Sequence, residues 1–149
     1  MAAATTTVYN TAQKHLDDDV DWSSDTIKVA LVSSSYTFSA AHEFFSSITN
    51  ELSTANGYTA GGATLGSKSR TQTSTVTAYK AAATTWTPGA GQTLTARRAI
   101  VYKDTGSAAT SPLLCSVLLD SAPADVSATN AAFTLTWDST DGVFKVTAS

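Results

Sequence analysis

The chain has 149 residues, the usual length of one domain, and 42% of them are hydrophobic, enough for a core without disulfides or metals. Charged residues make up only 14%, and 26 Thr and 19 Ser supply much of the polar surface instead. The net charge of −3 provides no basic face, which argues against a nucleic-acid-binding protein.

The N-terminal residues, the length of the apolar runs and the one cysteine indicate in which cellular compartment the protein is expected. Residues 1–5 have neither a basic segment nor a long apolar run, so we expect no signal peptide. No run approaches the ~18 apolar residues that a membrane span requires. Cys115 lies in an apolar stretch, where cysteine behaves as a small buried hydrophobe. We therefore expect a soluble protein made in a cytoplasm, with no membrane partner and no cofactor.

The first third of the chain mixes helical and strand patterns. Residues 1–8 are expected to form an extended arm. Apolar residues recur every fourth position in 8–16, which predicts a short helix. Alternation in 26–32 predicts a strand with one buried face. Helical spacing returns in 42–52 and predicts a second short helix lying on the edge of the sheet.

The remainder is dominated by short alternating runs that predict strands separated by turns. These runs are residues 71–78, a short strand ending at Trp86, and residues 93–104, 112–120, 133–137 and 143–146. The run 112–120 is apolar on both faces, as expected of a central strand, and the pair Arg97-Arg98 indicates a β-bulge. Residues 138–142 are expected to close a hairpin, and Trp137 is expected in the core.

Seven or eight short strands at this spacing predict an all-β fold. We expect one β-sandwich domain spanning residues 1–149, jelly-roll-like, with one or two short helices near the N-terminal third. The glycine-rich segment 57–66 predicts a loop that lies against backbone or contacts another subunit.

Few residues suggest chemistry. The chain has two histidines, His15 and His42, and no Gly-x-Ser-x-Gly motif, so we expect no catalytic residues. The glycine-rich segment lacks the Gly-Lys-Ser/Thr of a phosphate-binding loop, and we expect no cofactor-binding residues. Both observations favour a protein that is not an enzyme.

The acidic segment from Asp17 to Asp25 is the one candidate for a metal. An EF-hand loop beginning at Asp17 would need glycine and glutamate where Trp22 and Lys28 stand. We therefore interpret the segment as a solvated acidic turn and assign no metal ligands, while a looser site for a hard cation stays open.

Five aromatic residues are candidates for an interface, because aromatic side chains are enriched in the buried centres of interfaces. Trp22 lies in the acidic segment and Trp86 beside a turn, so both are expected to be partly exposed. Tyr36, Phe38 and Tyr58 follow strands or lie in loops. Local packing is the alternative for each of them.

The chain resembles a group of small accessory virion structural proteins of tailed bacteriophages and prophages. The resemblance runs from about residue 9 to the end of the chain. It is carried by residues 25–32, 36–37, 42–44, 50–51, 57–65, 99–106 and 111–113, together with Trp137 and Gly142. The basic pair Arg97-Arg98 and the Thr-rich segment 67–77 depart from the pattern.

This resemblance implies a non-enzymatic structural protein of the virion, made in the cytoplasm of the bacterial host. The first expectation is a capsid decoration (cement) protein that binds and stabilises the assembled head. A tail, neck or fibre component is the first alternative, and a carbohydrate- or receptor-binding module is the second. The expected partners are the major capsid protein or other virion proteins, with self-association as a dimer or trimer.

Overall fold

Strands account for most of the regular structure in the computed structural model, which describes residues 1–122 and 124–148. The strands are β1 (Thr5–Val8), β2 (Ile27–Val32), β3 (Ala63–Thr64), β4 (Ser69–Thr73), β5 (Val76–Lys80), β6 (Thr84–Trp86), β7 (Thr93–Ala96), β8 (Arg98–Lys103), β9 (Leu113–Leu118), β10 (Val126–Thr129), β11 (Phe133–Leu135) and β12 (Phe144–Thr147). The helical elements are α1 (Ala12–Asp18) and two 3-10 turns, η1 (Phe45–Ser47) and η2 (Ala108–Thr110).

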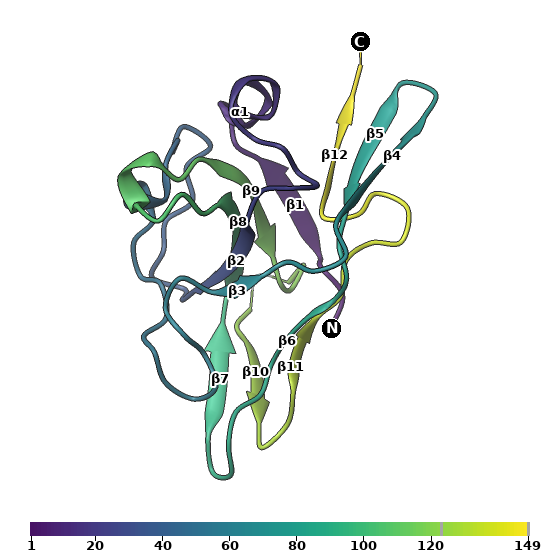
Figure 1. Cartoon of the computed structure of the whole chain (residues 1–149). Helices are drawn as coiled ribbons and strands as arrows, with labels where there is room; N and C mark the ends of the chain where they lie inside the picture. Colours follow the sequence, from purple (N-terminus) through teal and green to yellow (C-terminus); the bar gives the residue numbers. More distant parts are fainter. Residues whose placement is uncertain (123, 149) are drawn as a thin grey trace.

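The strands form antiparallel sheets of different sizes (Figure 1). A five-stranded sheet has the order β1-β9-β8-β2-β3, and a three-stranded sheet has the order β12-β5-β4. Two further pairs, β10-β7 and β11-β6, extend below the larger sheet in Figure 1. The all-β class is thereby confirmed, whereas the jelly-roll sandwich stays a prediction. Residues 5–8 of the expected arm are β1, which pairs with β9.

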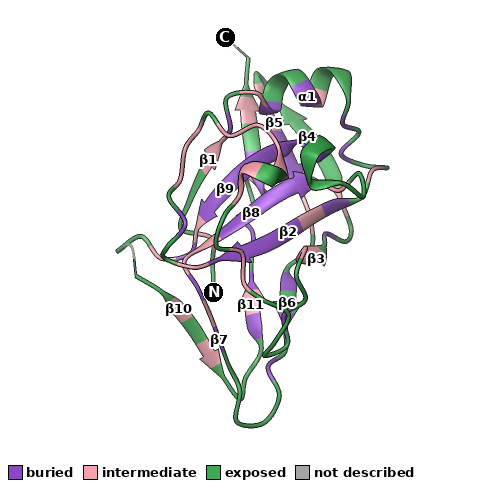
Figure 2. Cartoon of the chain, turned by 90° about the vertical axis from the view of Figure 1, so that its left-hand side faces the viewer, coloured by how far each residue is buried: buried purple, intermediate pink, exposed green. Residues whose placement is uncertain are grey.

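The core is centred on β8, which lies between β2 and β9 (Figure 2). Almost every residue of these three strands is buried. Valine, isoleucine and leucine predominate there, and their stiff or bulky side chains suit a packed, pleated surface. The expected central position of 112–120 is confirmed. The single buried face expected for 26–32 is wrong, because Ala30 and Val32 on the other face are also fully buried.

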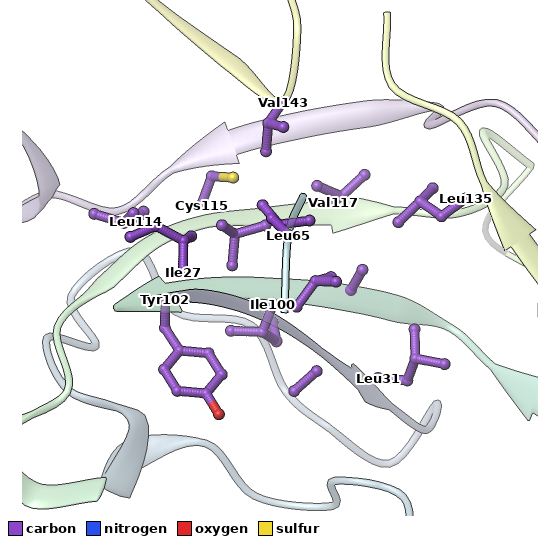
Figure 3. Packing of buried hydrophobic residues seen from close by; sticks show 14 of the residues in the cluster. Ile27, Leu31, Leu65, Ile100, Tyr102, Leu114, Cys115, Val117, Leu135 and Val143 are labelled. Atoms are coloured by element: carbon purple, nitrogen blue, oxygen red, sulfur yellow. The ribbon is translucent and has the colours of Figure 1, made fainter. Parts of the chain in front are cut away.

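Each face of this sheet is covered by a different part of the chain. In Figure 3, Cys115 and Val117 point to the side on which Val143 lies, and Tyr102 points to the opposite side. The ring of Tyr102 stacks on that of Phe45, with centroids 4.1 Å apart. The segment 36–58, which contains Phe45, therefore covers the face of the sheet to which Tyr102 points. The predicted burial of Cys115 is confirmed, since it is 0% exposed.

The three-stranded sheet is joined to the core through Trp22. The rings of Tyr79 on β5 and Phe144 on β12 stack with centroids 4.5 Å apart. The indole of Trp22 meets both rings edge-on, at 5.6 and 5.5 Å. Its Nε1–H donates to the carbonyl of Lys80 over 3.1 Å, which satisfies the one polar atom of the buried ring. Trp22 of the acidic segment therefore links this sheet to the core, together with the fully buried Val143 that precedes β12.

The helix predicted over residues 42–52 is wrong, because only the single turn η1 forms there. Phe44 is extended and bridges Pro112, and the N–H of Phe45 donates to the carbonyl of Ser111. The two phenylalanines then contact different neighbours, Phe44 meeting His15 and Phe45 meeting Tyr102. Pairing with a distant strand outweighs the helical spacing of the apolar residues.

Three strand predictions need correction. The run 71–78 is a hairpin rather than one strand, since Ser74 adopts a positive φ of 55° between β4 and β5. The chain passes from one sheet to another at Arg97, and the register shift in β8 lies between Val101 and Tyr102 instead. After the turn at 138–142 the chain pairs β12 with β5, not with β11. The first is decided by a local turn at Ser74, and the last by pairing between strands far apart in the sequence.

We expect Trp22→Ala to destabilise the protein by about 3–5 kcal/mol, the usual cost of removing a buried large aromatic side chain. The matched variant Trp22→Phe keeps an aromatic ring against Tyr79 and Phe144 and should lose about 1 kcal/mol, mainly the hydrogen bond to Lys80. Urea unfolding followed by circular dichroism measures both. Equal, small losses in the two variants would contradict the role assigned to the indole.

Candidate functional site

Four of the five aromatic residues predicted for an interface are buried within the chain itself. Trp22 is 1% exposed and Trp86 5%, so their expected partial exposure is wrong. Trp86 lies opposite Phe133 in the β6–β11 pair and close to Tyr58, which provides it with a local aromatic environment. The local packing alternative describes both tryptophans. Trp137 is also buried, as predicted, and donates to the carbonyl of Ala82.

Tyr36 and Phe38 pack around the N-terminal end of α1. The hydroxyl of Tyr36 lies 3.2 Å from that of Tyr9 and 3.1 Å from Nδ1 of His42. Burial raises the pKa of both tyrosines, so their hydroxyls act as neutral hydrogen-bonding groups. Phe38 is only half-buried, and the guanidinium of Arg98 stands 5.1 Å above its ring. Phe38 alone of the five retains part of its surface.

Tyr58 belongs to a hydrogen-bonded clamp that holds the glycine-rich loop against β2. Its hydroxyl donates to Glu51 Oε1 over 2.6 Å and accepts from the N–H of Leu31 over 3.1 Å. The same carboxylate oxygen accepts from the N–H of Gly61. Tyr102, on the neighbouring strand β8, donates its hydroxyl hydrogen to the carbonyl of Gly61 over 2.6 Å. The loop therefore lies against the chain's own backbone, which agrees with the first of its two predicted roles.

Three segments far apart in the sequence form this clamp. Residues 50–51, 57–65 and 99–106 come together where the loop crosses the five-stranded sheet. Gly62 approaches β2 so closely that a Cβ there would lie 2.0 Å from the carbonyl oxygen of Val29. These contacts hold the loop as a backbone framework.

A charged cluster that the sequence analysis did not predict surrounds His15. Its Nδ1 lies 3.0 Å from Asp19 Oδ2, and its Nε2 lies 3.1 Å from Glu43 Oε1. Because the carboxylates meet opposite ring nitrogens, the three side chains do not converge on one point where an ion could bind. The imidazole is buried and lines a cleft of about 440 Å³ with Lys14 and Lys103. The i, i+4 spacing of His15 and Asp19 on a helix could have predicted their contact, but nothing local in the sequence indicates Glu43.

The histidines are occupied by structural contacts. Both ring nitrogens of His15 face carboxylates, and Nδ1 of His42 faces Tyr36. Among the described residues, no hydrogen bond joins either histidine to a serine, threonine or cysteine side chain. A nucleophile activated by an adjacent base is therefore not seen in the part of the chain that the structure describes.

In the acidic segment, aspartate side chains accept hydrogen bonds from nearby backbone N–H groups of the same segment. Asp21 Oδ1 accepts from the N–H groups of Ser23 and Ser24, and Asp25 Oδ2 accepts from the N–H of Asp21. Asp25 also pairs with Lys103 at 2.9 Å. No group of three or more potential metal ligands occurs within residues 1–122 and 124–148. The segment is therefore a turn with exposed carboxylates at Asp17, Asp18, Asp19 and Asp21, as predicted, and Asp25 ties it to β8.

The three-stranded sheet carries an exposed strand and an open groove. One face packs on the core through Tyr79 and Phe144, whereas the other is hollowed by a groove of about 400 Å³. Thr71 and Thr73 of β4, Ala78 of β5 and Lys145 of β12 line this groove, beneath the turn at 139–141. Hydroxyl and methyl groups predominate on its β4 side. Lys80 and Asp141 line the groove as well, so it presents hydroxyl groups together with three charged side chains.

Apolar anchors are scarce on the surface. Among the described residues, Met1 is the one large hydrophobic side chain classed as exposed, at 38%. None of the described helices is long and apolar enough to cross a membrane. Any protein partner would therefore be recognised through backbone edges and polar side chains more than through a hydrophobic hot spot.

Comparisons with known proteins identified no relative. No family model, no curated protein and no solved structure matches the chain.

We expect Gly62→Ala to destabilise the protein by about 2–5 kcal/mol, because a positive φ is combined with the collision against β2. Gly91→Ala is the matched control: its φ of +76° resembles the +80° of Gly62, but a Cβ there would meet no atom within 4 Å. The control should cost about 1–2 kcal/mol. Thermal and urea unfolding measure the difference, and equal losses would show that the close approach to β2 is unimportant.

We expect stability to fall as the pH falls from about 5 toward 2. The Lys28 ammonium and the Gly106 N–H, which donate to Asp104, hold the pKa of that carboxyl below its usual value near 3.8. Backbone N–H donors lower the pKa of Asp21 and Asp138 likewise. Because these pKa values are lower in the folded state, the unfolded chain binds protons first, and acid favours unfolding.

The variant Asp104→Asn isolates one of these contributions. Its urea midpoint should change less between pH 6 and pH 3 than that of the unaltered protein, since residue 104 no longer titrates. An identical pH dependence in the two proteins would show that the Lys28–Asp104 pair does not contribute to acid stability.

Proposed function

We propose that this chain is a non-enzymatic structural protein of a tailed-phage virion, and that it decorates the assembled head. One observation carries the proposal: all five residues of β4, the outer strand of the three-stranded sheet, are exposed, and among the described residues Met1 is the one large hydrophobic side chain exposed. A surface of this kind suits docking through strand edges and hydroxyl groups.

The residues of the resemblance support the same proposal. They include the clamp of Glu51, Tyr58 and Gly61, the buried strand β2 and most of β8, which are elements of a scaffold. The near neutrality of the surface is also favourable, because an ion buried without a partner at a capsid interface costs several kcal/mol. A decoration protein of this type stabilises the shell by binding the assembled lattice more tightly than free subunits.

The alternatives are supported less well. A carbohydrate-binding module would use exposed faces of Trp22, Trp86 and the loop tyrosines, but both tryptophans are buried, and so are Tyr36 and Tyr58. A tail, neck or fibre component would use the same scaffold, and differs from a decoration protein in its location and copy number.

We expect purified virions of the encoding phage to contain many copies of this protein spread over the head. Quantitative mass spectrometry measures the copy number relative to the major capsid protein, and immunogold labelling locates the protein. A few copies confined to one vertex or to the tail would contradict decoration and favour the tail or neck alternative. Complete absence from virions would contradict a structural role in the particle.

The thermal stability of isolated phage heads, compared with and without this protein, tests the stabilisation of the shell. Heads assembled without this protein should break at a lower temperature than complete heads, and added protein should restore the difference. Heads with equal stability in the two preparations would contradict the cement role even if the protein is present.

A further inference from the structure

β4 stands out among the described strands because all five of its residues are exposed. It is the outer strand of the β12-β5-β4 sheet, and the β4–β5 hairpin projects from the body of the molecule (Figure 1). Proteins usually protect such an edge with proline, a bulge or several charges. β4 contains no proline, pairs with β5 without a register shift, and carries one charge, at Arg70.

The backbone groups on the open side of β4 can be assigned from the hydrogen bonds of β5. The N–H of Ala148 donates to the carbonyl of Thr75, so alternate residues of β5 from Thr75 direct their backbone groups toward β12. Ala78, between them, faces β4 and bonds to its partner Thr71. It follows that the N–H and C=O groups of Arg70 and Gln72 point outward, away from the sheet.

This open edge is complementary to itself. In an antiparallel pair centred on Thr71, Arg70 of one copy lies opposite Gln72 of the other, and Thr71 lies opposite Thr71. The outward backbone groups of Arg70 and Gln72 then meet and can exchange their hydrogen bonds. A register that placed Arg70 opposite Arg70 would bring like charges together, which is unfavourable. The charge at Arg70 therefore disfavours the register centred on Arg70 and is compatible with the one centred on Thr71.

We propose that two copies of this chain pair through β4, antiparallel and two-fold symmetric, with Thr71 of each copy beside the axis. The two three-stranded sheets become one continuous sheet, and the Thr-lined grooves of the two copies lie on the same face of it. The interface is isologous, as two-fold dimers require. This inference does not depend on the role of the protein in a virion.

The other edges fit a second copy less well. β3 has two residues, and the open edge of β12 faces the segment around β1, with which it lines a separate cleft. β1 and β10 are each four residues long and include half-buried positions. β4 is the longest of these edge strands, and its side chains are free on both faces.

A cysteine placed at the axis tests the register directly. In an antiparallel sheet, a directly opposed pair of the kind expected for Thr71 has Cα atoms about 4.5 Å apart, within the range that a disulfide spans. The natural Cys115 is fully buried, and its burial raises the pKa of its thiol, so it does not compete. We expect Thr71→Cys to form a covalent dimer under mild oxidation.

Two variants serve as controls. Thr73→Cys lies on the same strand and face, but its two copies would be roughly 13 Å apart along the paired strands and cannot bridge. Thr5→Cys is exposed on β1, another edge strand. Thr71→Cys should crosslink about tenfold faster than either, in protein whose circular dichroism and melting temperature match those of the unaltered chain.

A second substitution tests the backbone contacts. Gln72→Pro removes an outward N–H while leaving the bonds between β4 and β5 in place, and proline is tolerated at such edge positions. The two-fold axis repeats the change in both copies, so two intermolecular hydrogen bonds are lost. The association constant should therefore fall about 30-fold. In the Thr71→Cys background, this substitution should abolish the rapid crosslinking.

The possible outcomes separate the alternatives. Equal crosslinking of all three cysteine variants would indicate random collision and overturn the proposal. Rapid crosslinking of Thr73→Cys or Thr5→Cys alone would place the contact in another register or on another strand. A folded Thr71→Cys protein that does not crosslink at high concentration would overturn self-pairing and leave β4 to a different chain.

Discussion

The burial of β8 between β2 and β9 is the constraint on which the rest of the structure depends. These strands are apolar on both faces, and the low content of charged residues leaves little with which to solvate either face. Both faces must therefore be covered by other parts of the same chain. The irregular segment 36–58 covers one of them, and Trp22, Val143 and the smaller sheets cover the other.

The way in which these faces are covered explains why the strand β4 is exposed. The indole of Trp22 and the stacked rings of Tyr79 and Phe144 occupy the inner face of the β12-β5-β4 sheet. Once that face is buried, the hairpin of β4 and β5 extends past the core, and nothing in the described chain covers its outer strand. The same aromatic contacts that complete the core therefore produce the exposed edge.

The sequence predicted the elements whose side chains decide their structure and missed those decided by backbone pairing. The strands around Val29, Ile100 and Cys115 were predicted because their apolar residues are dense enough to require burial. The 42–52 helix failed because its backbone bonds to Ser111 and Leu113, a contact that no local pattern reveals. The burial of Trp22 was missed for a related reason. Its immediate neighbours in sequence are the polar residues Asp21 and Ser23, but its neighbours in space are aromatic rings.

The same distinction applies to the candidate site. Composition indicated a surface of hydroxyl groups, but not that β4 would be exposed on both faces, which follows from the turn at Ser74 and the pairing of β12 with β5. A strand without buried side chains receives little stabilisation from its own residues and depends on its hydrogen bonds to β5. An open edge of this kind promotes indiscriminate aggregation unless its register is restricted. The single charge at Arg70 provides such a restriction, because it disfavours the self-pairing register centred on itself and is compatible with the one centred on Thr71.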